Sequence, residues 1–215
     1  REMEQLDLWN RFIRYEMGNP NNLNANDLRS VICLLYEQCL CCFGRNAEVW
    51  LSYAKYVSTA EVDAGSGSSS NTAAAAAAAA TDGAVDGDVA GISTSSSSSE
   101  AASISTAEDA ARAVYAQAIL AIPGSALIRV ASAEFEEGCD RLTVAHAIFK
   151  EAFKKLPSGF TFSALQACLR RTVGTAAARR AFTETFQERN EKAYGFDIYV
   201  SHALLEVETN AAPEV

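Results

Sequence analysis

Six cysteines and two histidines are the side chains of this chain best suited to metal binding or nucleophilic chemistry. Cys39 and Cys42 have the C-x-x-C spacing, but no second such pair occurs and no histidine stands at a zinc-ligand spacing from any cysteine. Cys41 and Cys42 are adjacent, so a helix directs them to different faces, which disfavours both a disulfide and a nucleophilic pair. The sequence therefore predicts no metal site, and it favours buried thiols in a reducing nuclear or cytosolic compartment.

Acid–base chemistry would need carboxylates or histidines held close together. Glu16 and Glu206 lie far apart in the chain, each without a second acid at a fixed spacing, so we expect them to form hydrogen bonds between packed helices. His146 and His202 have no neighbouring cluster of Cys or Asp, which favours packing on helix faces. No glycine-rich phosphate loop followed by Lys occurs. These patterns predict a protein that is not an enzyme, with no catalytic residues and no cofactor.

A basic block is the strongest sign of ligand binding. Residues 141–192 carry 10 basic and 4 acidic side chains, a net charge of +6, within a chain of net charge −9. The block could attract RNA phosphates or an acidic protein, or it could be a solvated outer face. Few aromatic residues alternate with these charges, which argues against base stacking. The candidate partner or RNA contacts are Lys154, Lys155, Arg170, Arg171, Arg179 and Arg180.

The elements that must position these residues are helices. Apolar residues recur at three- and four-residue intervals, and no segment shows the alternation of a strand. Short breaks with Gly, Asn or Pro separate the helices. No run of about 18 apolar residues could cross a membrane. The predicted helices are 3–17, 26–43, 46–58, 107–121, 125–138, 141–155, 160–172, 175–190 and 193–208.

One segment has a different composition. Residues 58–106 contain eight consecutive alanines, five consecutive serines and no aromatic residue. Such a segment cannot bury a core, so we predict a disordered insertion that is open to proteases. The chain is thereby divided into helical repeats over 1–57, the insertion over 58–106, and further repeats of the same array over 107–215.

The predicted helices alternate between two patterns. One places bulky residues three and six positions after the first, with Glu at the seventh in some copies, as in Trp9, Phe12, Tyr15 and Glu16. The other places a small residue three positions, and a large apolar one four positions, after an aromatic. The aromatics of the second pattern, Tyr36, Tyr115, Phe149 and Phe182, are spaced by 79, 34 and 33 residues. Without the 49-residue insertion the first spacing also approaches 34, so the period predicts a solenoid of helical hairpins.

The residues that define the two patterns are expected to pack neighbouring repeats together. Tryptophan could also be a hot spot for a partner, but at a repeat-defining position a core role is favoured. The predicted repeat-packing residues are Trp9, Phe12, Glu16, Tyr36, Leu40, Trp50, Tyr53, Tyr115, Phe149, Phe182, Tyr199 and Glu206.

These motifs resemble a known repeat. Trp-x-x-Phe-x-x-Tyr-Glu at 9–16 and Tyr-Glu-x-Cys-Leu at 36–40 are similar to the HAT, or half-a-TPR, motif. The longer run from Leu8 to Glu16, the Asn19-Pro20 pair and the segment before Trp50 resemble the suppressor-of-forked family. Residues 129, 57 and 169 depart from that family's pattern, as does the insertion.

The resemblance implies a fold and a function. It implies an all-α fold, an α-α superhelix of HAT/TPR-like hairpins. It also implies a nuclear, non-catalytic scaffold that bridges protein subunits in pre-mRNA 3′-end cleavage and polyadenylation, with a homodimer in the full-length protein and RNA contact secondary. Other HAT proteins support an alternative, an RNA-binding solenoid in splicing or ribosomal RNA processing.

Overall fold

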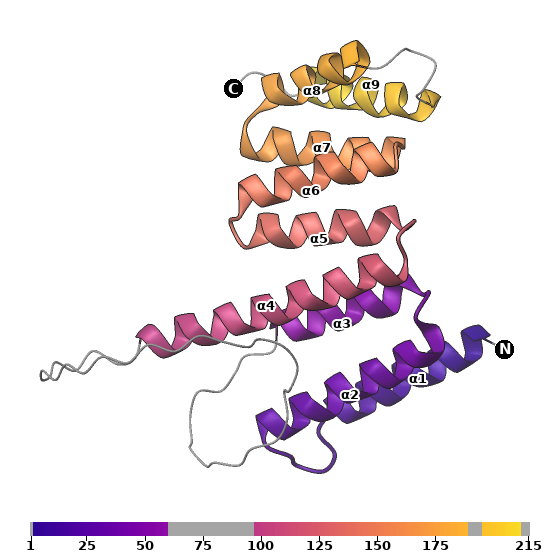
Figure 1. The fold of residues 1–215 in the computed structure, drawn as a ribbon, viewed down its shortest axis with the longest axis vertical. Helices are drawn as coiled ribbons and strands as arrows, with labels where there is room; N and C mark the ends of the chain where they lie inside the picture. Colours follow the sequence, from indigo (N-terminus) through magenta and orange to yellow (C-terminus); the bar gives the residue numbers. More distant parts are fainter. Residues whose placement is uncertain (1, 60–96, 189–194, 212–215) are drawn as a thin grey trace, which may run out of the picture.

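A computed structural model describes residues 2–59, 97–188 and 195–211. Over these residues every regular element is a helix (Figure 1). The helices are α1 (Glu2–Met17), α2 (Ala25–Phe43), α3 (Ala47–Thr59), α4 (Ser97–Ala121), α5 (Ala126–Gly138), α6 (Leu142–Lys155), α7 (Gly159–Thr172), α8 (Thr175–Glu188) and α9 (Phe196–Ala211).

Local sequence sets where several helices begin and end. Asn24 and Ser125 are N-caps whose side chains accept the backbone N–H three residues later. Ser158 and Thr161 form a reciprocal capping box at the start of α7. The helix α7 ends at Thr172, and two residues later Gly174 has a φ of 112°, which suits glycine, and donates its N–H to the carbonyl of Leu169. Asn24, Ser158 and Gly174 lie in the short breaks that the sequence predicts, and Ser125 stands at the predicted start of its helix.

The helices lie across the long axis of the molecule and stack along it from α1 to α9 (Figure 1). Consecutive helices form antiparallel hairpins, so α5, α7 and α9 run parallel to one another. Side-chain bonds confirm this arrangement: Gly159 meets Asp197 at the starts of α7 and α9, and Arg170 meets Glu208 near their ends. The predicted α-α superhelix of helical hairpins is therefore confirmed.

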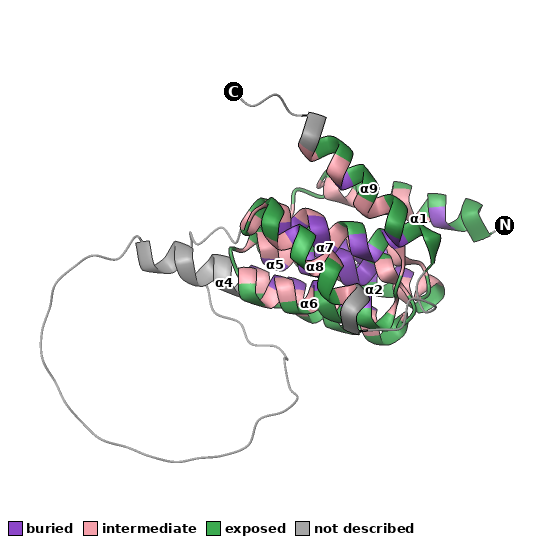
Figure 2. Ribbon diagram, turned by 90° about the horizontal axis from the view of Figure 1, so that it is seen from above, coloured by how far each residue is buried: buried purple, intermediate pink, exposed green. Residues whose placement is uncertain are grey.

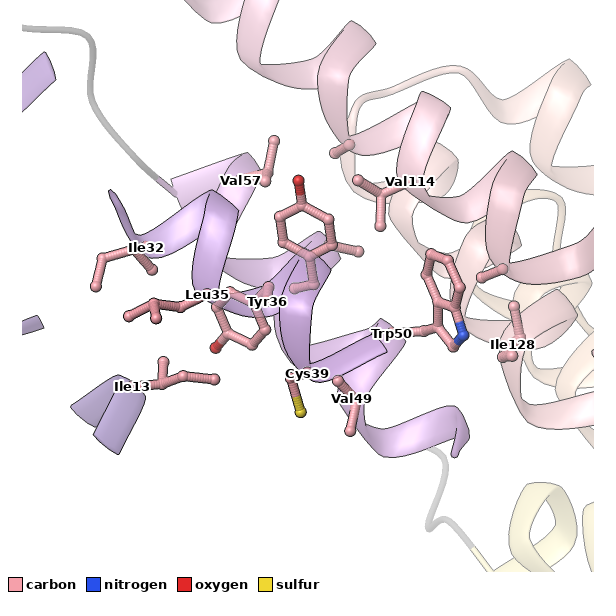
Figure 3. Close-up of a cluster of buried hydrophobic side chains, with 14 of the residues drawn as sticks. Ile13, Ile32, Leu35, Tyr36, Cys39, Val49, Trp50, Val57, Val114 and Ile128 are labelled. Carbon is pink, nitrogen blue, oxygen red and sulfur yellow. The ribbon is translucent and has the colours of Figure 1, made fainter. Parts of the chain in front are cut away.

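The core is the seam between these hairpins (Figure 2). Its largest cluster joins α1 to α5 and contains Ile32, Tyr36, Trp50 and Ile128 (Figure 3). Smaller clusters centre on Phe149 and on Phe162 in the C-terminal hairpins. Each cluster combines residues of successive repeats, so no hairpin buries its apolar face alone.

The helix that follows the insertion starts earlier than predicted. The sequence places its start at residue 107, but α4 begins at Ser97, within the serine run. Alanine and serine permit helix, and attachment to a packed helix removes the nucleation cost that disfavours such a segment in isolation. Residues 60–96, the larger part of the predicted insertion, lie outside the described residues.

Two predicted packing residues are more exposed than the repeat pattern implies. Phe12 is 45% exposed and Tyr199 is 40% exposed. In α1 the buried face is instead formed by Leu6 and Ile13, and in α9 Ile198 is fully buried. The main contacts of α1 are with α2 and those of α9 are with α7, so each end helix is packed mainly on one side. A helix that packs on one side only buries a narrower stripe of residues than the repeat motif predicts, so some motif residues remain exposed.

Candidate interaction scaffold

In two of the repeats, the residue that opens the first pattern anchors the preceding loop. The Trp50 indole N–H donates to the Gly44 carbonyl at 2.8 Å, and the indole is buried between helices. Arg129 stands where the pattern loses its aromatic, and its Nη2 donates to the Pro123 carbonyl at 3.2 Å. Both bonds reach back six residues. Arg129 therefore keeps the loop contact of the repeat although it departs from the motif.

The remaining packing residues follow the predicted pattern inside the array. Tyr36 and Tyr53 are buried and stack with ring centroids 5.2 Å apart, and the Tyr53 hydroxyl donates to Glu37. Burial raises the pKa of both phenols. Phe149 is fully buried. Four other predicted packing residues are half-buried at the edges of the core clusters, namely Trp9, Leu40, Tyr115 and Phe182.

The glutamate at the end of the first pattern joins consecutive helices. Glu136 is 6% exposed, and its carboxylate accepts the Arg112 Nε–H at 3.0 Å and lies 3.3 Å from Arg141. Glu206 accepts two bonds from Arg179 of α8, at 2.7 and 2.8 Å. Glu16 is half-buried on α1. The expected interhelical bond is therefore present at Glu206 and also at Glu136, whereas among the described residues the Glu16 side chain makes none.

Several cations of the basic block are paired with acidic side chains of the same chain. Arg171 donates two bonds to Glu137 of α5, and Arg170 lies 3.2 Å from Glu208 of α9. Lys155 pairs with Glu151 one turn earlier on α6. Together with the Arg179 pair, four of the six candidate contacts have an acidic partner. Among the described residues, only Lys154 and Arg180 of the six have none.

The ion pairs that link α5, α7 and α9 join residues that are about one repeat apart in the sequence. Arg171 and Glu137 are 34 residues apart, the period of the array, and Arg170 and Glu208 are 38 apart. A search for opposite charges at one repeat spacing would have found the Glu137 pair, which the motifs of single helices do not reveal. We conclude that these arginines fasten one repeat to the next.

His202 belongs to a packed junction of α7, α8 and α9. Its ring stacks on the Phe182 ring with the two centroids 3.8 Å apart, and its Nδ1 lies 2.9 Å from the Gln166 amide nitrogen. Burial lowers the pKa of His202, although Glu206 opposes that shift. His146 bonds the Thr172 hydroxyl at 2.8 Å. Both histidines thus lie at helix contacts, as the sequence predicts.

The cysteines are structural where they are buried. Cys39 and Cys168 are fully buried, and burial raises the pKa of both thiols, that of Cys168 to about 11. All six cysteines are free, and Cys41 and Cys42 are exposed on α2. Over the ranges that the structure describes, no group of three or more His, Cys, Asp and Glu could hold a metal ion. No described helix is both long and apolar enough to span a bilayer.

The Arg171–Glu137 pair predicts a pH-dependent contribution to stability. The hydrogen bonds that Arg171 donates hold the pKa of the Glu137 carboxyl below its ordinary value, which is near 4.3 in an unfolded chain. A lowered folded pKa stabilises the fold above the unfolded pKa, and that stability is lost as pH falls through the folded pKa. Arg171→Met should cost about 1 kcal/mol at pH 7, and the cost should shrink below pH ~4 in urea unfolding.

The control for this pair is Arg180→Met, since Arg180 is exposed and has no ion-pair partner among the described residues. Its effect on the free energy of unfolding should be small and independent of pH. Equal costs for the two variants, or a cost for Arg171→Met that grows toward acid, would show that the pair does not stabilise the array.

Stacked helical hairpins joined by repeat-spaced side-chain pairs define this chain as a helical-repeat protein of the α-solenoid class. The comparison with known families narrows that class, because the suppressor of forked protein family (Suf) matches residues 1–215. The chain belongs to the suppressor-of-forked family.

One curated relative extends the comparison. Cleavage stimulation factor subunit 77 of Arabidopsis thaliana is 23% identical over 215 residues, which are 100% of this chain. The match covers 23% of that protein, so this chain spans about a quarter of the relative's length.

Proposed function

We propose that this chain is part of a nuclear, non-catalytic scaffold that bridges protein factors in pre-mRNA 3′-end cleavage and polyadenylation. The observation that carries the proposal is the family match over the whole chain, joined to a fold of stacked helical hairpins in which ion pairs link α5 to α7 and α8 to α9. A stack of this kind presents a long surface with fixed spacing, as bridging requires. The named relative is itself a cleavage stimulation factor subunit. The partners would be other protein subunits of the processing complex and, in the full-length protein, a second copy.

The second candidate function is direct RNA binding in splicing or ribosomal RNA processing. The net charge of +6 over 141–192 favours it. The ion pairs weigh against it, because Arg170, Arg171 and Arg179 are already held by acidic partners. A phosphate would have to displace a bonded carboxylate at each of them. We therefore rank RNA contact as secondary.

The test separates the two functions with a variant that leaves the interhelical pairs intact. Lys154→Gln/Arg180→Gln removes the two of the six candidate cations that have no acidic partner among the described residues, and Lys55→Gln on α3 is the exposed control. Capture of polyadenylation factors from nuclear extract should be the same for all three proteins. Binding of a labelled 20-nucleotide RNA should be weak and similar in all three by fluorescence anisotropy.

Tight RNA binding that falls about tenfold in the double variant but not in Lys55→Gln would reverse this ranking. A loss of roughly 0.7 log units of affinity per log unit of salt for each single-strand phosphate contacted would support that reversal. Absence of every 3′-end processing factor from the captured proteins would contradict the scaffold proposal itself.

A further inference from the structure

The parallel helices α5, α7 and α9 line a groove with a volume of about 1010 Å³. Each helix contributes residues at three- and four-residue intervals, so each presents one face along the groove. The lining of α9 runs from Phe196 to Glu208, which at ~1.5 Å per residue is about 18 Å. The groove therefore has the length of a helical segment of three to four turns.

The lining is apolar at the starts of the three helices and along α9. Leu127 of α5, Phe160 of α7 and Phe196 of α9 are 43%, 49% and 81% exposed. Val200 and Leu204 continue the stripe on α9, with Leu204 58% exposed. Apolar side chains that gather in one groove and remain this exposed mark an interaction site.

The charges that line the groove are mostly acidic. Glu134, Asp197 and Glu208 face a single cation, Arg170, for a net charge of −2. Arg170 is paired with Glu208, and Asp197 accepts the Gly159 N–H. Within the described ranges Glu134 has no ion-pair partner, and it lies toward the C-terminal ends of the helices, where their dipoles add negative potential. The lining therefore complements an occupant that is apolar on one side and basic toward one end.

We propose that this groove binds an amphipathic helix of a partner protein, with bulky apolar residues on one face and a Lys or Arg that pairs with Glu134. Helices commonly dock in grooves through apolar residues at such spacings. A symmetric dimer would set this acidic lining against itself, and RNA phosphates would meet a net negative surface. The proposal rests on the scaffold function and specifies one surface that performs it.

The experiment selects ligands from random sequences, so it does not require the partner to be identified first. A phage-displayed library of random 16-residue peptides is panned on the whole 215-residue chain, and enriched peptides are synthesised for fluorescence anisotropy. Enriched sequences should carry apolar residues at helical spacing and a basic residue toward one end. Val200→Ser/Leu204→Ser should weaken their binding by about tenfold or more. Val207→Ser is the matched control, because Val207 is 65% exposed on α9 but lies outside the groove.

A charge exchange tests the assigned orientation. Glu134→Lys should weaken the basic peptides, and replacing the peptide's basic residue by Glu should restore binding to that variant alone. Peptides that bind the groove variant and the wild type equally, or no enrichment at all, would overturn the proposal. So would a dimer in sedimentation that Val200→Ser/Leu204→Ser abolishes, since a second copy would then be the occupant.

The result is separable from the proposed function. If no peptide is selected but the processing factors are still captured, the groove proposal fails and the scaffold function stands. If groove-specific peptides are selected but no processing factor is captured, the groove stands and the function in 3′-end processing fails.

Discussion

Trp50→Ala should lower the free energy of unfolding by about 3–5 kcal/mol, the usual cost of truncating a buried aromatic. Trp50 is 8% exposed and points toward Val114 of α4 and Ile128 of α5 (Figure 3). Its removal leaves a cavity where three helices meet and an unbonded carbonyl at Gly44. Since small domains are stable by only ~5–15 kcal/mol, the variant should lose much of its stability to urea.

Two further variants divide this loss into its parts. Trp50→Phe keeps most of the apolar volume but removes the indole N–H, so it should cost about 1 kcal/mol for the hydrogen bond and part of the packing. Leu120→Ala on α4 is the control, because Leu120 is 81% exposed, and it should change stability by less than ~0.5 kcal/mol. If Trp50→Ala proved no more damaging than Leu120→Ala, Trp50 would not be part of the core.

Glu136→Gln is the second variant with a large expected effect. The Glu136 carboxylate is buried against Arg112, whose guanidinium also lies 5.8 Å from the centre of the Phe135 ring. Breaking a buried pair from one side costs about 3–5 kcal/mol. We expect about 2–3 kcal/mol here, because Arg112 keeps its bonds to Glu108 and Asp109. Chemical unfolding followed by circular dichroism measures the loss.

A double-mutant cycle shows whether the loss arises from the pair. Arg112→Met removes the other partner, and the two substitutions together should cost clearly less than the sum of the single costs. Glu134→Gln is the exposed control on the same helix and should be nearly neutral. Strict additivity would show that Glu136 and Arg112 act independently.

The repeat itself could be predicted because it is a local, periodic property. The Pro- and Gly-containing breaks and the capping residues Asn24, Ser125 and Ser158 act through neighbouring residues in the chain. Apolar spacing of three and four residues defines a helix face wherever the helix packs. For the same reason, the predicted packing residues Tyr36, Trp50, Tyr53 and Phe149 are buried within the array.

The charges could not be interpreted in the same way. From the sequence alone, the arginines of the basic block could attract phosphates or an acidic partner, or they could lie on a solvated outer face. Their partners, such as Glu137 for Arg171 and Glu206 for Arg179, are 34 and 27 residues away. Pairing across that distance depends on the register between stacked helices. Arg170, Arg171 and Arg179 of the basic block are therefore held in internal ion pairs, which a net charge cannot reveal.

The sequence by itself determined the helices and their period, since these follow from side-chain spacing along single helices, and its motifs carried the resemblance to the family. Only the tertiary structure decided which side of each end helix is buried, leaving Phe12 and Tyr199 exposed. It also brought the faces of α5, α7 and α9 together into one acidic, apolar groove. The physical reason is that burial, ion pairing and groove formation depend on which helices are neighbours, and neighbours in a solenoid are set by stacking between repeats.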